Sequence, residues 1–132
     1  KDLGIETIST GYILIDGGVQ SMVQVMSDTN PISMDRPDAI IAHALAAQYL
    51  GMKMIYLEAG SGATKSIDNN IIKSVSEIIN IPLIIGGGLR DPEIVSAKVN
   101  SGASIIVTGT ITEEDSSVMK EIASATHWKI ND

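Results

Sequence analysis

Three glycine-rich corners hold the residues of this sequence that could do chemistry. The first is Tyr56–Gly62, in which Glu58 precedes Gly60 and Gly62. A carboxylate can accept hydrogen bonds from the hydroxyls of a ligand, and glycines let backbone N–H groups approach an anion closely. The residues alone leave an alternative equally open, in which Glu58 pairs with a basic neighbour and the glycines only form a tight turn.

The second and third corners favour a phosphate-binding site. Gly86–Gly88 leads into a helix for which Asp91 is the predicted N-cap, and N–H groups beside the positive end of a helix attract an anion. Arg90 could assist, although pairing with Asp91 on the surface is the more ordinary interpretation. Val107–Thr110 ends the next strand in a similar way, and barrels frequently assemble a phosphate site from their last two strand ends.

Other chemistry-bearing patterns are weaker. Gly60–Ser66 does not fit a P-loop, because Ala63-Thr64 stands before Lys65-Ser66 where that motif needs glycine. The two histidines, His43 and His127, are far apart and show no metal-ligand spacing, which argues against a zinc site. Tyr12 stands at the end of the first predicted strand and is compatible with either a cavity or the core.

The elements that must position these corners follow from the apolar pattern. Four runs are too short for helices and too continuously apolar for a half-exposed sheet, so they predict strands: Glu6–Ile15, Lys53–Ala59, Pro82–Gly86 and Ser104–Thr108. Helical periodicity predicts helices at Asp38–Leu50, Asn69–Ile79, Pro92–Ser101 and Glu113–Ala125. The core-facing stripes predicted for the first two helices comprise Ile41, Ala44, Leu45, Tyr49, Ile71, Ile72, Val75, Ile78 and Ile79. Met22–Met26 is predicted as a short strand after a turn at Gly17-Gly18.

The alternation of strand and helix predicts an α/β fold with a parallel sheet. Glycine follows three successive strands, whereas a doubly wound sheet usually carries its glycine fingerprint once, after the first strand. Three such corners at one edge of a sheet point to a (β/α)8 TIM barrel. Because a whole barrel takes about 250 residues, the 132 residues, interpreted as a single piece, supply about half of one in about four parallel βα units.

Composition excludes several classes of function. Sixteen acidic residues against nine basic ones give a net charge of −7, which has the wrong sign for general nucleic-acid binding. The absence of cysteine removes disulfides, thiolate zinc sites and cysteine nucleophiles, and it agrees with a reducing cytoplasm.

Five strings closely resemble the C-terminal half of geranylgeranylglyceryl phosphate synthases: Thr10–Ile15, Ala46–Met52, Tyr56–Ala63, Ile81–Arg90 and Ile105–Thr110. The resemblance implies half of a TIM-barrel prenyltransferase, which transfers a geranylgeranyl group from its diphosphate to the C3 hydroxyl of sn-glycerol 1-phosphate in ether-lipid biosynthesis. Glu58 would bind the glycerol hydroxyls and assist proton removal, which makes it the catalytic candidate. The substrate-binding residues that the resemblance implies are Tyr56, Leu57, Glu58, Ala59, Gly60, Ser61, Gly62, Gly87, Gly88, Gly109 and Thr110.

The resemblance also implies components that this sequence lacks. Mg²⁺ would stabilise the departing diphosphate, and its ligands are expected in a missing N-terminal half, with none in this chain. The chain alone is expected to be inactive, and the open edges of a half-barrel predict pairing with that half or a homo-oligomer. The apolar substrate suggests the membrane surface as a location beside the cytoplasm. Two alternatives stay open: another phosphate-binding barrel enzyme of the isomerase or aldolase type, and a non-catalytic half-barrel.

Overall fold

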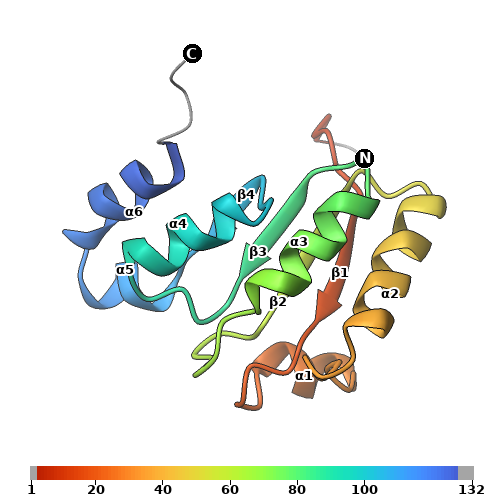
Figure 1. Ribbon diagram of the computed structural model, residues 1–132, viewed down its shortest axis with the longest axis horizontal. Helices are drawn as coiled ribbons and strands as arrows, with labels where there is room; N and C mark the ends of the chain where they lie inside the picture. Colours follow the sequence, from red (N-terminus) through yellow and green to blue (C-terminus); the bar gives the residue numbers. More distant parts are fainter. Residues whose placement is uncertain (1–2, 128–132) are drawn as a thin grey trace.

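Four parallel strands form one sheet in the order β1-β2-β3-β4 in the computed structural model, which describes residues 3–127 (Figure 1). The strands are β1 (Thr10–Leu14), β2 (Met54–Glu58), β3 (Leu83–Gly86) and β4 (Ile105–Val107). Each strand pairs with its neighbour along the chain in parallel register. The predicted α/β fold with a parallel sheet is therefore confirmed, and the carboxyl ends of the four strands meet along one edge of the sheet.

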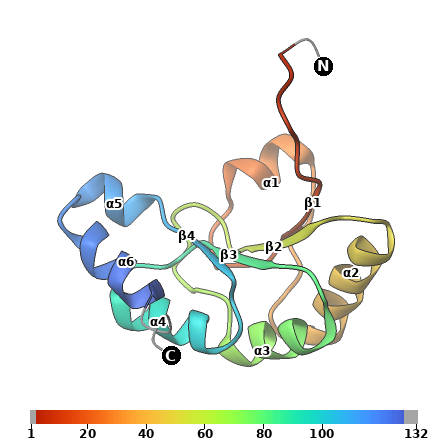
Figure 2. The ribbon, with the colours of Figure 1, turned by 90° about the horizontal axis from the view of Figure 1, so that it is seen from above.

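Helices cover one face of this sheet. The helices α2 (Pro37–Tyr49), α3 (Asn69–Ile78) and α4 (Pro92–Asn100) lie on the same side, as Figure 2 shows. The short helix α1 (Met22–Ser27) lies toward the opposite side, and α5 (Thr110–Glu114) and α6 (Val118–His127) follow β4. The helix-covered face holds the hydrophobic core.

The period-2 alternation along β2 separates the core from the polar face. Ile55 and Leu57 are fully buried members of the core cluster, together with Ile71, Ile72 and Val75 of α3. Successive side chains of a strand point to opposite faces, so Tyr56 and Glu58 lie on the face without the helix layer. The apolar residues of β2 thus anchor the strand while its polar residues remain available at the other face.

The first strand is shorter than predicted. Its ladder with β2 begins at the pair Thr10 and Met54, not at Glu6. A strand requires a hydrogen-bonded partner along its length, and before Thr10 the backbone bond from Lys53 N to Ser9 O is the contact that joins this segment to the next strand. The apolar side chains of Leu3, Ile5 and Ile8 are accordingly exposed.

The prediction of a strand at Met22–Met26 was wrong, because this segment forms helix α1. Ser21 caps the helix through its Oγ, which accepts a hydrogen bond of 3.3 Å from Gln24 N. The edge position that a hairpin strand would take is occupied by Ile32, whose backbone N–H and C=O pair with Leu14 O and Asp16 N, both at 2.9 Å. The local cap therefore decides the conformation of the segment.

The single helix predicted at Glu113–Ala125 was also wrong, because the chain forms two helices, α5 and α6, with a break between them. Asp115 Oδ1 accepts hydrogen bonds from Ser117 N at 2.9 Å and Ser117 Oγ at 2.6 Å. An aspartate that bonds the backbone two residues ahead forms a turn that competes with helical hydrogen bonding.

The core-facing stripe predicted for α2 was partly wrong. The buried residues of this helix are Ile40 and Ala44, whereas Tyr49 is 81% exposed. A Cβ atom built at Gly11 would lie 2.6 Å from the Ala47 Cβ, so β1 and α2 approach each other most closely there. Ile40, Ala44 and Ala47 therefore face the sheet, and Tyr49 points into solvent. In α3 the prediction failed at Ile78, which is exposed.

Leu83→Ala and Leu50→Ala test where the core lies. Leu83 of β3 is 1% exposed and Leu50 is 79% exposed. We expect Leu83→Ala to lower the free energy of unfolding by about 2–5 kcal/mol, because the cavity that it leaves is only partly refilled. Leu50→Ala should change the same quantity by less than about 0.5 kcal/mol. Urea unfolding followed by circular dichroism measures both, and equal losses would contradict this assignment of the core.

Candidate functional site

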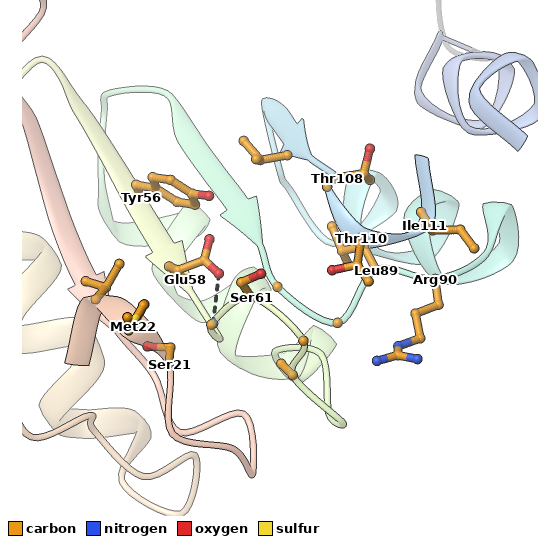
Figure 3. A pocket seen from close by; sticks show the side chains of 18 of the residues that line it. Ser21, Met22, Tyr56, Glu58, Ser61, Leu89, Arg90, Thr108, Thr110 and Ile111 are labelled. Atoms are coloured by element: carbon orange, nitrogen blue, oxygen red, sulfur yellow. Dashed lines mark hydrogen bonds between the residues drawn. The ribbon is translucent and has the colours of Figure 1, made fainter. Parts of the chain in front are cut away.

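A cavity of about 260 Å³ lies at the carboxyl ends of the four strands, where the three glycine corners meet (Figure 3). The sequence-predicted residues that line it are Tyr56, Glu58, Gly60, Ser61, Gly62, Gly87, Gly88, Gly109 and Thr110. Tyr12, Arg90 and Thr108 line it as well. The parallel register brings these corners together, although they are separated by about 20 to 30 residues along the chain.

Glu58 is 8% exposed, and its Oε1 accepts a hydrogen bond of 2.8 Å from Gly60 N, drawn in Figure 3. Within residues 3–127 the structure shows one ion pair, between Lys73 and Glu77. Glu58 therefore forms no ion pair with a basic neighbour among these residues, which was the alternative interpretation. The bond to Gly60 uses one carboxylate oxygen. The other oxygen, Oε2, faces Gly86, where a Cβ atom would meet it at 2.4 Å. The carboxylate is therefore held by its own loop at the wall of the cavity.

Two tyrosines stand beside this carboxylate. The rings of Tyr12 and Tyr56 form an edge-to-face pair with centroids 5.1 Å apart. Burial raises the pKa of Tyr12 to about 12, with a further contribution from the negative charge of Glu58. Burial raises the pKa of Tyr56 as well, and the neighbouring Glu58 carboxylate adds to the shift. Both shifts favour the protonated phenols, which can donate hydrogen bonds in the cavity.

The glycine corner after β3 packs against the loop after β2. Gly87 and Gly88 have φ angles of +85° and +69°, a conformation that side-chain-bearing residues rarely adopt. A Cβ atom at Gly87 would lie 2.8 Å from Gly60 N, and one at Gly88 would lie 2.9 Å from Ser66 N. Side chains at either position would therefore push the two loops apart.

Backbone donors remain free at these corners. Three N–H groups in the described part of the chain, those of Gly87, Gly88 and Gly109, donate no backbone hydrogen bond in the loops and turns. All three residues line the cavity. Unpaired N–H groups on a concave backbone surface form a site suited to an anion.

Two of the predicted site residues lie in the core, and two residues that were not predicted line the cavity. Leu57 and Ala59 are buried in the core and do not line the cavity, so their predicted contact with a substrate stays untested. Sequence reasoning missed the wall that Ser21 and Met22 provide before and within α1. The signal that could have revealed it is the serine cap, because a capped helix at this point carries Met22 over the strand ends.

The histidines and carboxylates do not gather into a metal site in the described part of the chain. Glu58 is the one carboxylate among the residues that line the cavity. No group of three His, Cys, Asp or Glu residues within residues 3–127 could hold a metal ion. His43 is exposed on α2 with its Nδ1 2.7 Å from Ala39 O, and His127 is exposed at the end of α6. The neighbour of His127, Trp128, lies outside the described residues.

The helices found between residues 3 and 127 are each too short or too polar to cross a membrane.

A family model and curated relatives show the family to which this chain belongs. The model of the PcrB family matches residues 1–126. The geranylgeranylglyceryl phosphate synthase of Chitinophaga pinensis is 44% identical over 127 residues, which cover 96% of this chain and 50% of that protein. The protein of the same name from Thermococcus kodakarensis is 46% identical over 120 residues, covering 91% and 47%. The chain spans about half the length of the curated relatives it matches.

Solved structures give the same result for the fold. The crystal structure of (S)-3-O-geranylgeranylglyceryl phosphate synthase from Thermoplasma acidophilum, in complex with its substrate sn-glycerol-1-phosphate, superposes with a TM-score of 0.87 and 35% identity. The match covers 93% of this chain and 50% of that one. The wild-type enzyme from Thermoplasma volcanium also gives 0.87, at 37% identity. The predicted half-barrel architecture is thereby confirmed.

The raised pKa of Tyr12 predicts a loss of stability at high pH. Its value of about 12 in the folded state lies above its ordinary value of 10.0. The protonated phenol therefore stabilises the fold fully below about pH 10, and this contribution is lost as pH rises from about 10 to 12. Tyr12→Phe should flatten this decline in the free energy of unfolding, measured in urea at stepped pH. Tyr49→Phe, which alters an exposed ring, is the matched control, and an unchanged slope in Tyr12→Phe would contradict the prediction.

Proposed function

Because the chain belongs to the PcrB family, we propose that it supplies the glycerol-phosphate-binding half of a prenyltransferase. The complete enzyme transfers a geranylgeranyl group from its diphosphate to the C3 hydroxyl of sn-glycerol 1-phosphate, in the biosynthesis of ether lipids. The observation that carries this proposal is the combination of groups that line one cavity. Glu58 and two phenols line it together with unpaired glycine N–H groups. A small ligand that carries both hydroxyls and a phosphate matches this combination.

One solved relative supports the same ligand. The structure of the Thermoplasma acidophilum enzyme contains sn-glycerol-1-phosphate, and that protein superposes on 93% of this chain. In the proposal, Gly87, Gly88, Gly109 and Thr110 bind the phosphate through backbone N–H groups. Tyr56, Ser61 and the loop that follows Glu58 surround the glycerol.

Glu58 would act on the hydroxyl that reacts. Its carboxylate accepts a hydrogen bond from a glycerol hydroxyl and orients the oxygen toward C1 of the prenyl chain. As the bond between that oxygen and C1 forms, the bond from C1 to the diphosphate breaks and its electron pair leaves with the diphosphate. The hydroxyl proton passes to the carboxylate of Glu58. The tie from Gly60 N holds the carboxylate in place for this step.

The rest of the reaction would require the part of the barrel beyond this chain. Ligands for Mg²⁺ at the diphosphate would come from another segment, and residues 3–127 contain no group of three His, Cys, Asp or Glu side chains that could hold a metal ion. The open edges of β1 and β4 would pair with that segment, and the completed protein would form a homo-oligomer. We place the enzyme in the cytoplasm, with its apolar product leaving at the membrane surface.

Substitution of Glu58 by glutamine tests the role of the carboxylate. Glutamine retains an Oε1 that can accept the hydrogen bond from Gly60 N, so the loop stays in place while the charge is removed. We expect the affinity for sn-glycerol 1-phosphate, measured by isothermal titration calorimetry, to fall about 10- to 100-fold, because a hydrogen bond to a charged group contributes about 1.5–3 kcal/mol. Glu77→Gln, at an exposed position on α3, is the control and should bind as the unchanged protein does.

The same titration separates the alternatives. Tighter binding of a triose or sugar phosphate than of sn-glycerol 1-phosphate would favour an isomerase or aldolase. Absence of any phosphate-ester binding would favour a half-barrel without a ligand site. The chain alone, supplied with geranylgeranyl diphosphate and Mg²⁺, should form no ether product, and a chain that does so by itself would contradict the need for a second half.

A further inference from the structure

A buried lysine outside the cavity stands out among the charged residues of the fold. Lys98 of α4 is 6% exposed, although lysine is almost never fully buried unless it is paired. It lies three residues after the buried Val95, on the stripe of α4 that faces the core. Nothing in the proposed reaction uses it. An apolar residue would ordinarily occupy this position, so the side chain needs a specific explanation.

The contacts of Lys98 supply one. Its Nζ donates hydrogen bonds of 2.7 Å to Ile67 O and 2.8 Å to Asn69 Oδ1. Ile67 is fully buried, and its carbonyl lies where the loop after β2 ends. Burial lowers the pKa of Lys98, while the nearby carboxylate of Asp68 acts in the opposite direction. The hydrogen bonds to the end of this loop thus offset part of the cost of burying the amine.

That loop is the one that carries Ser61 and Gly62 into the cavity. It is attached at two further points. Glu58 Oε1 holds Gly60 N at its start, and Gly17 O accepts hydrogen bonds from Thr64 N at 3.0 Å and Lys65 N at 3.1 Å in its middle. Lys98 forms the third attachment, through hydrogen bonds donated from the helix layer.

Helix α4 connects this attachment to the second glycine corner. The helix begins directly after Gly87–Arg90, and Asp91 caps it by accepting a hydrogen bond of 2.8 Å from Ile94 N. The glycine corner after β3 therefore adjoins the N-terminal end of α4, and Lys98, which bonds the loop after β2, lies near its C-terminal end. Movement of the end of the loop away from α4 would break both hydrogen bonds of Lys98.

We propose that Lys98 is a positioning residue, which holds the loop Gly60–Ile67 against the corner Gly87–Gly88 and so sets the spacing of the cavity wall. The effect of Lys98 on ligand binding rests on the proposed function, whereas its hydrogen bonds to the loop do not. Lys98 touches no ligand in this scheme. It acts through Ile67 and Asn69, from the side of the sheet that the helices cover.

Amide hydrogen exchange of the intact protein, followed by mass spectrometry, tests the grip directly. Lys98→Met keeps a long side chain but removes both donated hydrogen bonds. We expect the amides of residues 60–67 to exchange at least about tenfold faster in this variant, while those of β2 and β3 keep their rates. A uniform acceleration across the sheet and the loop would mean that Lys98 only stabilises the fold, and it would overturn the proposal.

Two further variants guard against a general loss of stability. Asn69→Ala removes one of the two acceptors at an exposed position, so the protein should fold and the loop should show a smaller acceleration of the same kind. Lys73→Met is the matched control, because it removes an exposed lysine from α3 and should leave the loop unchanged. Equal loop exchange in Asn69→Ala and the unchanged protein, together with unchanged exchange in Lys98→Met, would refute the grip.

Titration of the same variants with sn-glycerol 1-phosphate tests the consequence. The dissociation constant should rise at least about fivefold in Lys98→Met and stay unchanged in Lys73→Met. A faster loop with unchanged affinity would overturn the positioning role. If the unchanged protein does not bind sn-glycerol 1-phosphate, the proposed function fails, whereas the exchange measurements still decide whether Lys98 holds the loop.

Discussion

The parallel register between β2 and β3 is the constraint on which the rest of the site depends. It pairs Glu58 with Gly86, and Ala59 N donates to Gly86 O at 3.0 Å just beyond the ladder. A shift of one residue would turn Tyr56 and Glu58 toward the helices and Leu57 toward the cavity. The burial of Leu57 and Ile55 in the core opposes such a shift. The hydrophobic effect on one face thereby holds the polar groups in place on the other.

The absence of side chains is as important as their presence at the strand ends. Gly86 leaves room for the Glu58 carboxylate and the Tyr56 hydroxyl, both of which would lie 2.4 Å from a Cβ atom there. Gly17 lies against Ala59 O in the same manner and lets the loop after β1 meet the loop after β2. Close approach of backbones brings N–H groups and a carboxylate into one small cavity, and only glycine permits it.

Much of this arrangement could be predicted from local patterns. Continuous apolar runs identified all four strands, with the greatest error at the exposed start of β1. The bounds of α3, to within one residue, and the cap at Asp91 were predicted correctly. Two of the errors arose where a side chain competed with the backbone pattern. Ser21 turned an apolar stretch into a helix, and Asp115 interrupted a helix by bonding Ser117. Propensity gives no measure of which of these short-range bonds prevails.

The sequence by itself determined the class of the fold, the location of the glycine corners and the candidate carboxylate, because each depends on residues close together in the chain. The tertiary structure decided what those residues contact. It placed Lys98 of α4 against a carbonyl 31 residues away, put Met22 at the cavity wall and left Tyr49 in solvent. These outcomes depend on how closely helices approach the sheet and where one strand end lies beside another. Such distances are set by packing between segments remote in sequence, which no local pattern of residues records.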